Sequence, residues 1–154
     1  MNTKPVDNNG IRIIELPPCK MASSRRHSLE EFDQWWSALD RERADRFYPR
    51  DFMYYDAQAK ELVWLYPYPV DAVKPVIYEA VDFRGGLYAA AISRDGDDID
   101  GERAVHEIKE WILTTKYFQI DESPERHELF HVTTSDTAFE KMGYRQLDIY
   151  VPIK

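Results

Sequence analysis

The sequence has little of what marks disulfide-rich, membrane-spanning or nucleic-acid-binding proteins. It contains a single cysteine, Cys19, so no internal disulfide can form, which suits a reducing compartment. No apolar run approaches the roughly 20 residues that span a bilayer, and no signal-peptide pattern follows the N-terminus. Its 28 acidic and 20 basic side chains give a net charge of −8, which would repel a phosphate backbone. We therefore expect a cytoplasmic protein that binds neither membranes nor nucleic acid directly.

Motifs for phosphate, metal or nucleophile chemistry are also missing. There is no phosphate-binding glycine loop, no Gly-x-Ser-x-Gly elbow and no His-Glu-x-x-His sequence. The acidic stretch 94–100, RDGDDID, lacks the glutamate at position 12 that a helix-flanked calcium loop needs. His127 and His131 lie on an expected strand, about 13 Å apart, and could not share an ion. The sequence predicts no metal and no cofactor.

What the sequence has is length and many aromatic rings. Residues 1–10 are polar and are predicted to form a flexible leader, and residues 11–154 are long enough for one domain with a real core. Ten tyrosines and four tryptophans are more than such a core normally needs. Ordinary packing accounts for most of them, and the surplus is the reason to consider an aromatic-lined pocket.

Apolar periodicity predicts two main helices and several strands. Ser28 and Glu31 form a capping box that opens a helix ending near residue 44, and a second helix is expected over residues 101–115, capped by Asp98 or Asp100. Residues 20–24 are expected to continue the first strand, and Gly85-Gly86 to join two strands. The predicted strands are residues 11–16, 52–56, 62–66, 78–93 (a pair), 128–133 and 146–153.

The order strand, helix, strand, strand therefore occurs twice, although no clear sequence repeat accompanies it. The fold class predicted from this order is α+β, with duplicated β-α-β-β units that form a curved antiparallel sheet. Two main helices cover the sheet, and a ligand cleft is expected between the repeats.

The strand over residues 62–66 has two chemically different faces. Alternation puts Leu62, Trp64 and Tyr66 on one face and Val63 and Leu65 on the other. The aliphatic pair is expected to pack on a helix. The aromatic face is expected to form either a second core layer or the wall of a ligand pocket.

Carboxylates interleaved with aromatic rings are the main functional signal. Glu79 falls on the apolar face of its strand, and Asp148 and Tyr150 share the face of the closing strand that points away from the core. A desolvated carboxylate beside stacked rings suits an aromatic cation, and it could equally act as a general base in a hydrolytic reaction. The structural alternatives are an ion pair of Glu79 with an arginine or with Lys109, and a solvent-facing Asp148. His131 is a further candidate, with a satisfied interior histidine as its alternative.

Several stretches resemble the GyrI-like family, the bacterial effector-binding domain that occurs alone or at the C-terminus of MerR- and AraC-type multidrug regulators. The resemblance covers nearly all of residues 11–154. It rests on FYPRDFMYYD, VWLYPYP, VDFRGGLYAAAIS, IKEWI and GYRQLDIYVPIK, of which GGLYA and IYVPIK are the most telling.

The resemblance implies a duplicated β-α-β-β fold that binds bulky, often cationic, aromatic compounds in a cleft of tyrosines and tryptophans with a buried acid. The tyrosine of the family's closing strand falls on Tyr150. The family's strand glutamate falls on or near His131, with Glu128 as a nearby alternative. If His131 holds that place, Glu79 or Asp148 must supply the acid, or the ligand is not a simple cation.

These observations lead to one favoured function and two alternatives. The favoured one is a small-molecule binding module, without a DNA-binding domain of its own because the residues before 11 are too few. The first alternative is a small hydrolase of reactive aromatic compounds with Glu79 and Tyr150 as catalytic residues, and the second is an inhibitor of, or regulatory partner to, another protein. The predicted ligand-binding residues are Trp64, Tyr66, Glu79, Tyr88, Trp111, His131, Asp148 and Tyr150.

Overall fold

The computed structural model describes residues 10–44 and 50–154. The chain divides into two compact units, Met1–Pro17 with Gly85–Lys154 (unit 1) and Pro18–Arg84 (unit 2). Except for Gly10, the predicted leader lies outside the described residues, as do residues 47–49 of the stretch FYPRDFMYYD. The single domain over residues 11–154 stays a prediction.

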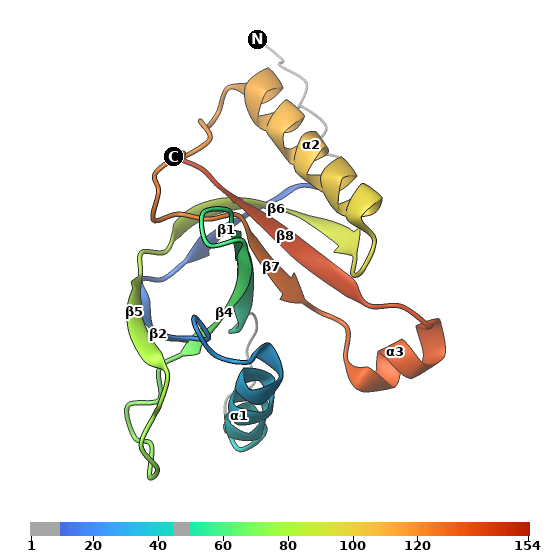
Figure 1. Cartoon of the computed structure of the whole chain (residues 1–154). Coiled ribbons are helices and arrows are strands. Elements are labelled where there is room, and N and C mark those ends of the chain that lie inside the picture. The colour runs from blue at the N-terminus through green and yellow to red at the C-terminus, as the bar shows by residue number, and fades with distance from the viewer. Residues whose placement is uncertain (1–9, 45–49) are drawn as a thin grey trace. The chain divides into compact units, whose positions relative to one another are not determined.

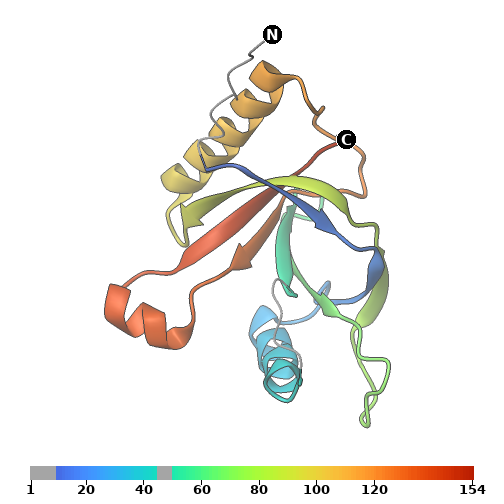
Figure 2. The same cartoon turned by 180° about the vertical axis from the view of Figure 1, so that it is seen from behind.

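Unit 1 contains an antiparallel sheet in the order β1-β6-β8-β7, with helix α2 on one face (Figure 1). Both β6 and β8 are flanked by strands of their own unit, and the view from behind shows β1 running beside β6 (Figure 2). The elements of unit 1 are β1 (Arg12–Leu16), β6 (Gly86–Arg94), α2 (Asp98–Thr115), β7 (Leu129–Val132), α3 (Asp136–Met142) and β8 (Gln146–Pro152).

Unit 2 contains four antiparallel strands of the sheet, in the order β3-β4-β2-β5. Its helix, α1, packs against one face of that sheet. The elements of unit 2 are β2 (Cys19–Ser23), α1 (Leu29–Arg41), β3 (Phe52–Asp56), β4 (Glu61–Pro67) and β5 (Glu79–Phe83).

The two units repeat one arrangement. In β2-α1-β3-β4 and in β6-α2-β7-β8 the first strand pairs with the last, and the last also pairs with the strand before it. An additional strand, β5 in unit 2 and β1 in unit 1, pairs with the free side of the first strand. This confirms the predicted α+β class with duplicated β-α-β-β units, antiparallel pairing and two main helices. The ligand cleft between the repeats stays a prediction.

Two local predictions need correction. Residues 20–24 do not continue the first strand, because β1 pairs with β6 whereas β2 pairs with β4 and β5. Pro17 and Pro18 separate the two strands, since a proline cannot donate to a ladder. The second helix begins at Asp98 rather than at residue 101, because Asp97 caps it by accepting the Asp100 N–H at 3.0 Å. The predicted Ser28 cap is confirmed, with the Glu31 N–H 3.3 Å from its hydroxyl.

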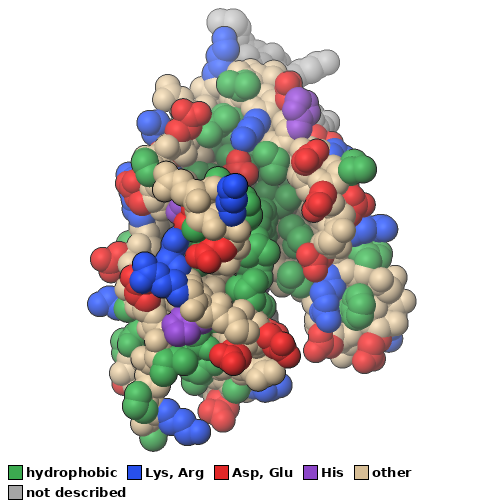
Figure 3. Space-filling view, viewed as in Figure 1, with side chains coloured by type: hydrophobic (Ala, Val, Ile, Leu, Met, Phe, Trp, Pro, Cys, Tyr) green, Lys and Arg blue, Asp and Glu red, His purple; other side chains and the backbone are tan. Residues whose placement is uncertain are grey.

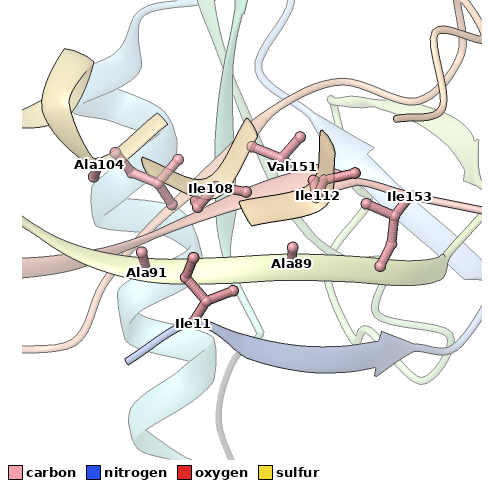
Figure 4. Packing of buried hydrophobic residues seen from close by; sticks show 9 residues of the cluster. Ile11, Ala89, Ala91, Ala104, Ile108, Ile112, Val151 and Ile153 are labelled. Carbon is pink, nitrogen blue, oxygen red and sulfur yellow. The ribbon is translucent and has the colours of Figure 1, made fainter. Parts of the chain in front are cut away.

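The core of unit 1 lies between α2 and one face of the sheet (Figure 4). Ala89 and Ala91 of β6 have only a methyl group on this face, so the larger Ile108 and Ile112 of α2 can fill the layer. The predicted core face of the closing strand is confirmed. The buried residues of this cluster are Ile11, Ala89, Ala91, Ala104, Ile108, Ile112, Ile149, Val151 and Ile153.

The core of unit 2 lies on the aromatic face of β4, for which we expected either a second core layer or a pocket wall, and the helix packs there rather than on the aliphatic face. Trp64 and Tyr66, and not Val63 and Leu65, pack with Phe32 of α1. The reason is that the apolar stripe of α1 is itself aromatic, so its rings pack against the rings of β4. The Phe32 and Trp64 ring centroids, for example, lie 6.2 Å apart.

The short helix α3 contributes no buried residue. Around it, at the lower right of Figure 3, hydrophobic side chains lie among acidic and basic ones. Phe139 of this helix lies under the Arg145 guanidinium, 4.4 Å from its ring centroid. Among the described residues, no helix is long and apolar enough to cross a membrane.

The packing of α2 predicts how two similar substitutions on one helix will differ. Ile108 is fully buried whereas Leu113 is 66% exposed. We expect Ile108→Ala to lower the free energy of unfolding by about 2–5 kcal/mol, because it leaves a cavity in the layer. The control Leu113→Ala should change it by less than about 0.5 kcal/mol. Equal effects in urea unfolding would contradict the assignment of the buried face.

Candidate functional site

The face of the unit 1 sheet opposite α2 gathers chemically distinctive side chains. Cα partners in an antiparallel ladder share a face, so the register decides which residues lie together. Among the described elements of unit 1, α2 is the helix that packs on the sheet, and it covers the other face. We call the opposite surface the tyrosine face, made of Arg12, Ile14, Tyr88, Ala90, Leu129, His131, Asp148 and Tyr150.

Four of the predicted ligand-binding residues lie on this face: Tyr88, His131, Asp148 and Tyr150. Each is less than a tenth exposed. His131 of β7 is the Cα partner of Asp148 on β8, so the position that resembles the family's strand glutamate lies directly beside an aspartate. The closing-strand alternation predicted the orientation of Asp148 and Tyr150, but the solvent-facing alternative for Asp148 is wrong.

Two tyrosines form the aromatic part of the face. The rings of Tyr88 and Tyr150 meet edge to face, with centroids 6.3 Å apart and planes at 89°. This geometry matches the positive edge of one ring with the negative face of the other. The Tyr150 hydroxyl donates a hydrogen bond to Asp148 Oδ2 at 3.1 Å.

Asp148 is held from its other side by an arginine. Arg12 Nη2 donates to Asp148 Oδ1 at 2.6 Å, so both carboxylate oxygens accept a hydrogen bond. Arg12 reaches β8 from β1 across β6, where its neighbour is the small Ala90. The hydrogen bond and charge of Asp148 raise the pKa of Arg12 despite partial burial. The negative charge of Asp148 is therefore paired with the Arg12 guanidinium and is not open to a ligand as an anionic anchor.

A second guanidinium lies against Tyr88. Arg126 is buried, its Cζ lies 4.6 Å from the Tyr88 ring centroid, and its Nη1 pairs with Asp121 at 2.9 Å. It also donates to the carbonyls of Leu87 and Ile153. Residues 121–126 lie outside the predicted helices and strands, and no local pattern in the sequence indicates that this arginine is buried.

Gly86 makes room for that arginine. Its φ is +110°, which favours glycine, and a Cβ here would lie 3.0 Å from Arg126 Nη2. The predicted break at Gly85-Gly86 is therefore confirmed. It serves both the backbone turn into β6 and the close approach of the guanidinium.

The remaining predicted residues lie elsewhere. Trp111 is on α2 and packs against the core on the opposite face of the sheet. Trp64 and Tyr66 belong to the core of unit 2, and burial raises the pKa of Tyr66. The Tyr66 hydroxyl donates to Asp40 Oδ1 at 3.0 Å and accepts from Arg43 Nη1 at 3.3 Å.

Glu79 is not the desolvated carboxylate that its apolar neighbours suggested. It is exposed on β5, and the strand that pairs with β5 is β2. The predicted alternative of an ion pair with Lys109 is wrong, because Lys109 pairs with Glu128 at 3.0 Å. Among the described residues, no three histidine, cysteine or acidic side chains are grouped so that they could hold a metal ion.

Comparisons with known proteins show the fold. No family model and no curated protein matches the sequence. Solved structures that are similar over 94% of this chain include the EcmrR C-terminal domain (TM-score 0.59, 9% identity, 96% of that chain) and SAV2435 bound to tetraphenylphosphonium (0.53, 9%, 93%). A hydrolase from Listeria innocua is also similar (0.58, 11%, 91%). The chain shares the fold of these proteins, while membership of the GyrI-like family stays a prediction.

The Asp121–Arg126 pair generates a prediction about pH. Hydrogen bonds from Ser123 and Arg126 hold the pKa of Asp121 well below its usual range. The stability that this provides is complete above the unfolded pKa, about 3.9, and is lost as pH falls through the folded value. Asp121→Asn should lower the free energy of unfolding by about 3 kcal/mol at pH 7. This deficit should shrink as the pH is lowered below about 4.

Urea unfolding of wild type and variant at pH 7, 5 and 3 measures this deficit. The control Asp136→Asn removes a carboxylate whose side chain is 89% exposed, although it pairs with Arg145 at 2.7 Å. This control should cost less than about 1 kcal/mol, because water screens exposed ion pairs. A deficit for Asp121→Asn that is constant from pH 7 to 3 would show that its carboxylate charge is irrelevant to stability.

Proposed function

We propose that this chain is a small-molecule binding module that binds bulky aromatic compounds at the tyrosine face. The observation that carries the proposal is the edge-to-face pair of Tyr88 and Tyr150 beside Leu129, on the sheet face opposite α2, where each ring is 1% exposed. Rings of this kind offer a large apolar area together with a polar hydroxyl. Ligand sites are typically apolar and aromatic with a small number of placed polar groups, which here are Asp148 and His131.

A protein of the same fold supports this proposal. SAV2435 has been solved with tetraphenylphosphonium, a compound built from four aromatic rings. The fold is thus compatible with a bulky aromatic ligand. The structural similarity of this chain to the EcmrR C-terminal domain fits the resemblance of its sequence to the GyrI-like family, and that resemblance implies the same class of ligand.

Hydrolysis is the second candidate, because the fold is shared with a hydrolase and a carboxylate lies beside the Tyr150 hydroxyl. The geometry favours binding over hydrolysis. Both oxygens of Asp148 already accept hydrogen bonds, so a water molecule would have to compete with Arg12 and Tyr150 for this carboxylate. Glu79, the predicted base, is exposed and solvated. The role as a partner of another protein stays a prediction.

A thermal-shift screen against bulky aromatic compounds tests the proposal. A compound present at about a hundred times its dissociation constant should add about 2.7 kcal/mol, which raises Tm by several degrees. Tyr150→Leu should weaken binding about fivefold, because a ring contact is worth about 1 kcal/mol beyond its area. Chromatography of each bound compound distinguishes binding, which returns it intact, from hydrolysis.

The matched control is Tyr117→Leu, which makes the same exchange at a tyrosine that is 65% exposed and lies near Trp111 rather than on the tyrosine face. This variant should bind as wild type does. An equal loss of affinity in both variants, or no binding compound in the screen, would contradict the proposed site.

A further inference from the structure

The charges on the tyrosine face point to a particular class of ligand. We infer that this face accepts neutral or anionic aromatic compounds in preference to lipophilic cations, and that Arg12 is the residue that sets this preference. The inference rests on the proposed function and deepens it, because it specifies the charge of the ligand and the side chain that selects it.

Asp148 is already paired. Among the described strand residues of this face, Asp148 is the only acidic one. Its two oxygens accept from Arg12 Nη2 at 2.6 Å and from the Tyr150 hydroxyl at 3.1 Å. A cationic ligand at this carboxylate would have to compete with a guanidinium that lies 2.6 Å from it. The side chain of Asp148 is also mostly shielded from water, which strengthens its attraction to Arg12.

The strands of this face carry more positive than negative side chains. The register adds Arg94 to the same face of β6, so its strands carry two arginines and one aspartate. Arg94 itself lies over the Tyr144 ring, 4.1 Å from the centroid. A further cation would therefore meet like charges, which disfavour its binding.

A protein cation already lies against the Tyr88 ring. The guanidinium of Arg126 lies 4.6 Å from the centroid of this ring, and so takes a position that a ligand cation would need for a cation–π contact. Arg126 is only 8% exposed, and its Nε–H has no hydrogen-bond acceptor among the described residues. A buried donor of this kind costs free energy, and an acceptor group on a ligand could satisfy it.

Arg12 is the side chain through which the preference can be changed. Its side chain is 47% exposed, unlike that of Arg126, so it can be replaced without emptying a core position. Without its guanidinium, Asp148 would keep the bond from Tyr150 and have one oxygen open. The face would then present an uncompensated carboxylate, which is what an aromatic cation requires.

The experiment compares probes that differ in charge but carry the same phenyl groups. Tetraphenylphosphonium is the cation, tetraphenylborate the anion and triphenylphosphine oxide a neutral compound with one acceptor. Affinities are measured by isothermal titration at pH 8 and physiological salt, where carboxylates are ionised. We expect wild type to bind the anion and the neutral compound at least about tenfold more tightly than the cation, which corresponds to about 1.4 kcal/mol.

Three variants separate charge from packing. Arg12→Gln should strengthen binding of tetraphenylphosphonium and weaken that of tetraphenylborate, whereas Arg12→Lys keeps the charge and should keep the wild-type order. Asp148→Asn should move the preference further toward the anion. The control Arg103→Gln makes the same change in net charge on α2, where Arg103 pairs with Asp100 and Glu107, and should leave the order unchanged.

The outcomes distinguish this inference from the proposed function. If no probe of any charge binds, the proposed function fails. If the probes bind but wild type prefers the cation, or Arg12→Gln leaves the order as it was, the inference fails while the proposed function stands. Melting curves identify a variant that does not fold. In that case the order of the three affinities in wild type and in Arg12→Lys still decides whether the face prefers neutral and anionic compounds to the cation.

Discussion

The hydrogen-bonded pair of Arg12 and Asp148 is the interaction on which the charge of the tyrosine face in unit 1 depends. It joins β1 to β8 across β6, between residues that are 136 positions apart in the chain. The β6 partner of Arg12 is the small Ala90, so the guanidinium can pass over β6 to the carboxylate, which lies two residues from Tyr150, the β8 partner of Ala90. Because the acid is neutralised in this way, it can lie beside buried tyrosines without an unpaired charge.

The two repeats share a topology but use the faces of their sheets in opposite ways. In unit 1 the alanines of β6 lie under α2, and the tyrosines of β6 and β8 lie on the other face. In unit 2 the rings of β4 lie under α1 and the aliphatic residues lie on the other face. One repeat therefore packs its rings under a helix, and the other has two buried tyrosines on the face opposite its helix. This difference, more than the shared fold, is why we propose a ligand site on unit 1.

Sequence reasoning succeeded where the signal is local. Periodicity predicted the duplicated order of elements, Ser28 and Glu31 predicted the start of α1, and alternation oriented Asp148 and Tyr150. It failed where contacts between distant parts of the chain decide which side chains are buried. The helix-packed face of β4 depends on rings of α1, and the exposure of Glu79 depends on β5 pairing with β2. The partners of Arg12 and Arg126 lie on other elements, so no periodicity predicts them.

The most direct test of the account is fluorine NMR of the chain labelled with fluorotyrosine, titrated with triphenylphosphine oxide and assigned through single Tyr→Phe variants. The account predicts that the resonances of Tyr88 and Tyr150 shift on binding. Those of the exposed Tyr55 and Tyr117 should stay in place, because neither residue lies on the tyrosine face. Binding that shifts the exposed tyrosines, or Tyr66 in the core of unit 2, and leaves Tyr88 and Tyr150 unchanged would contradict it.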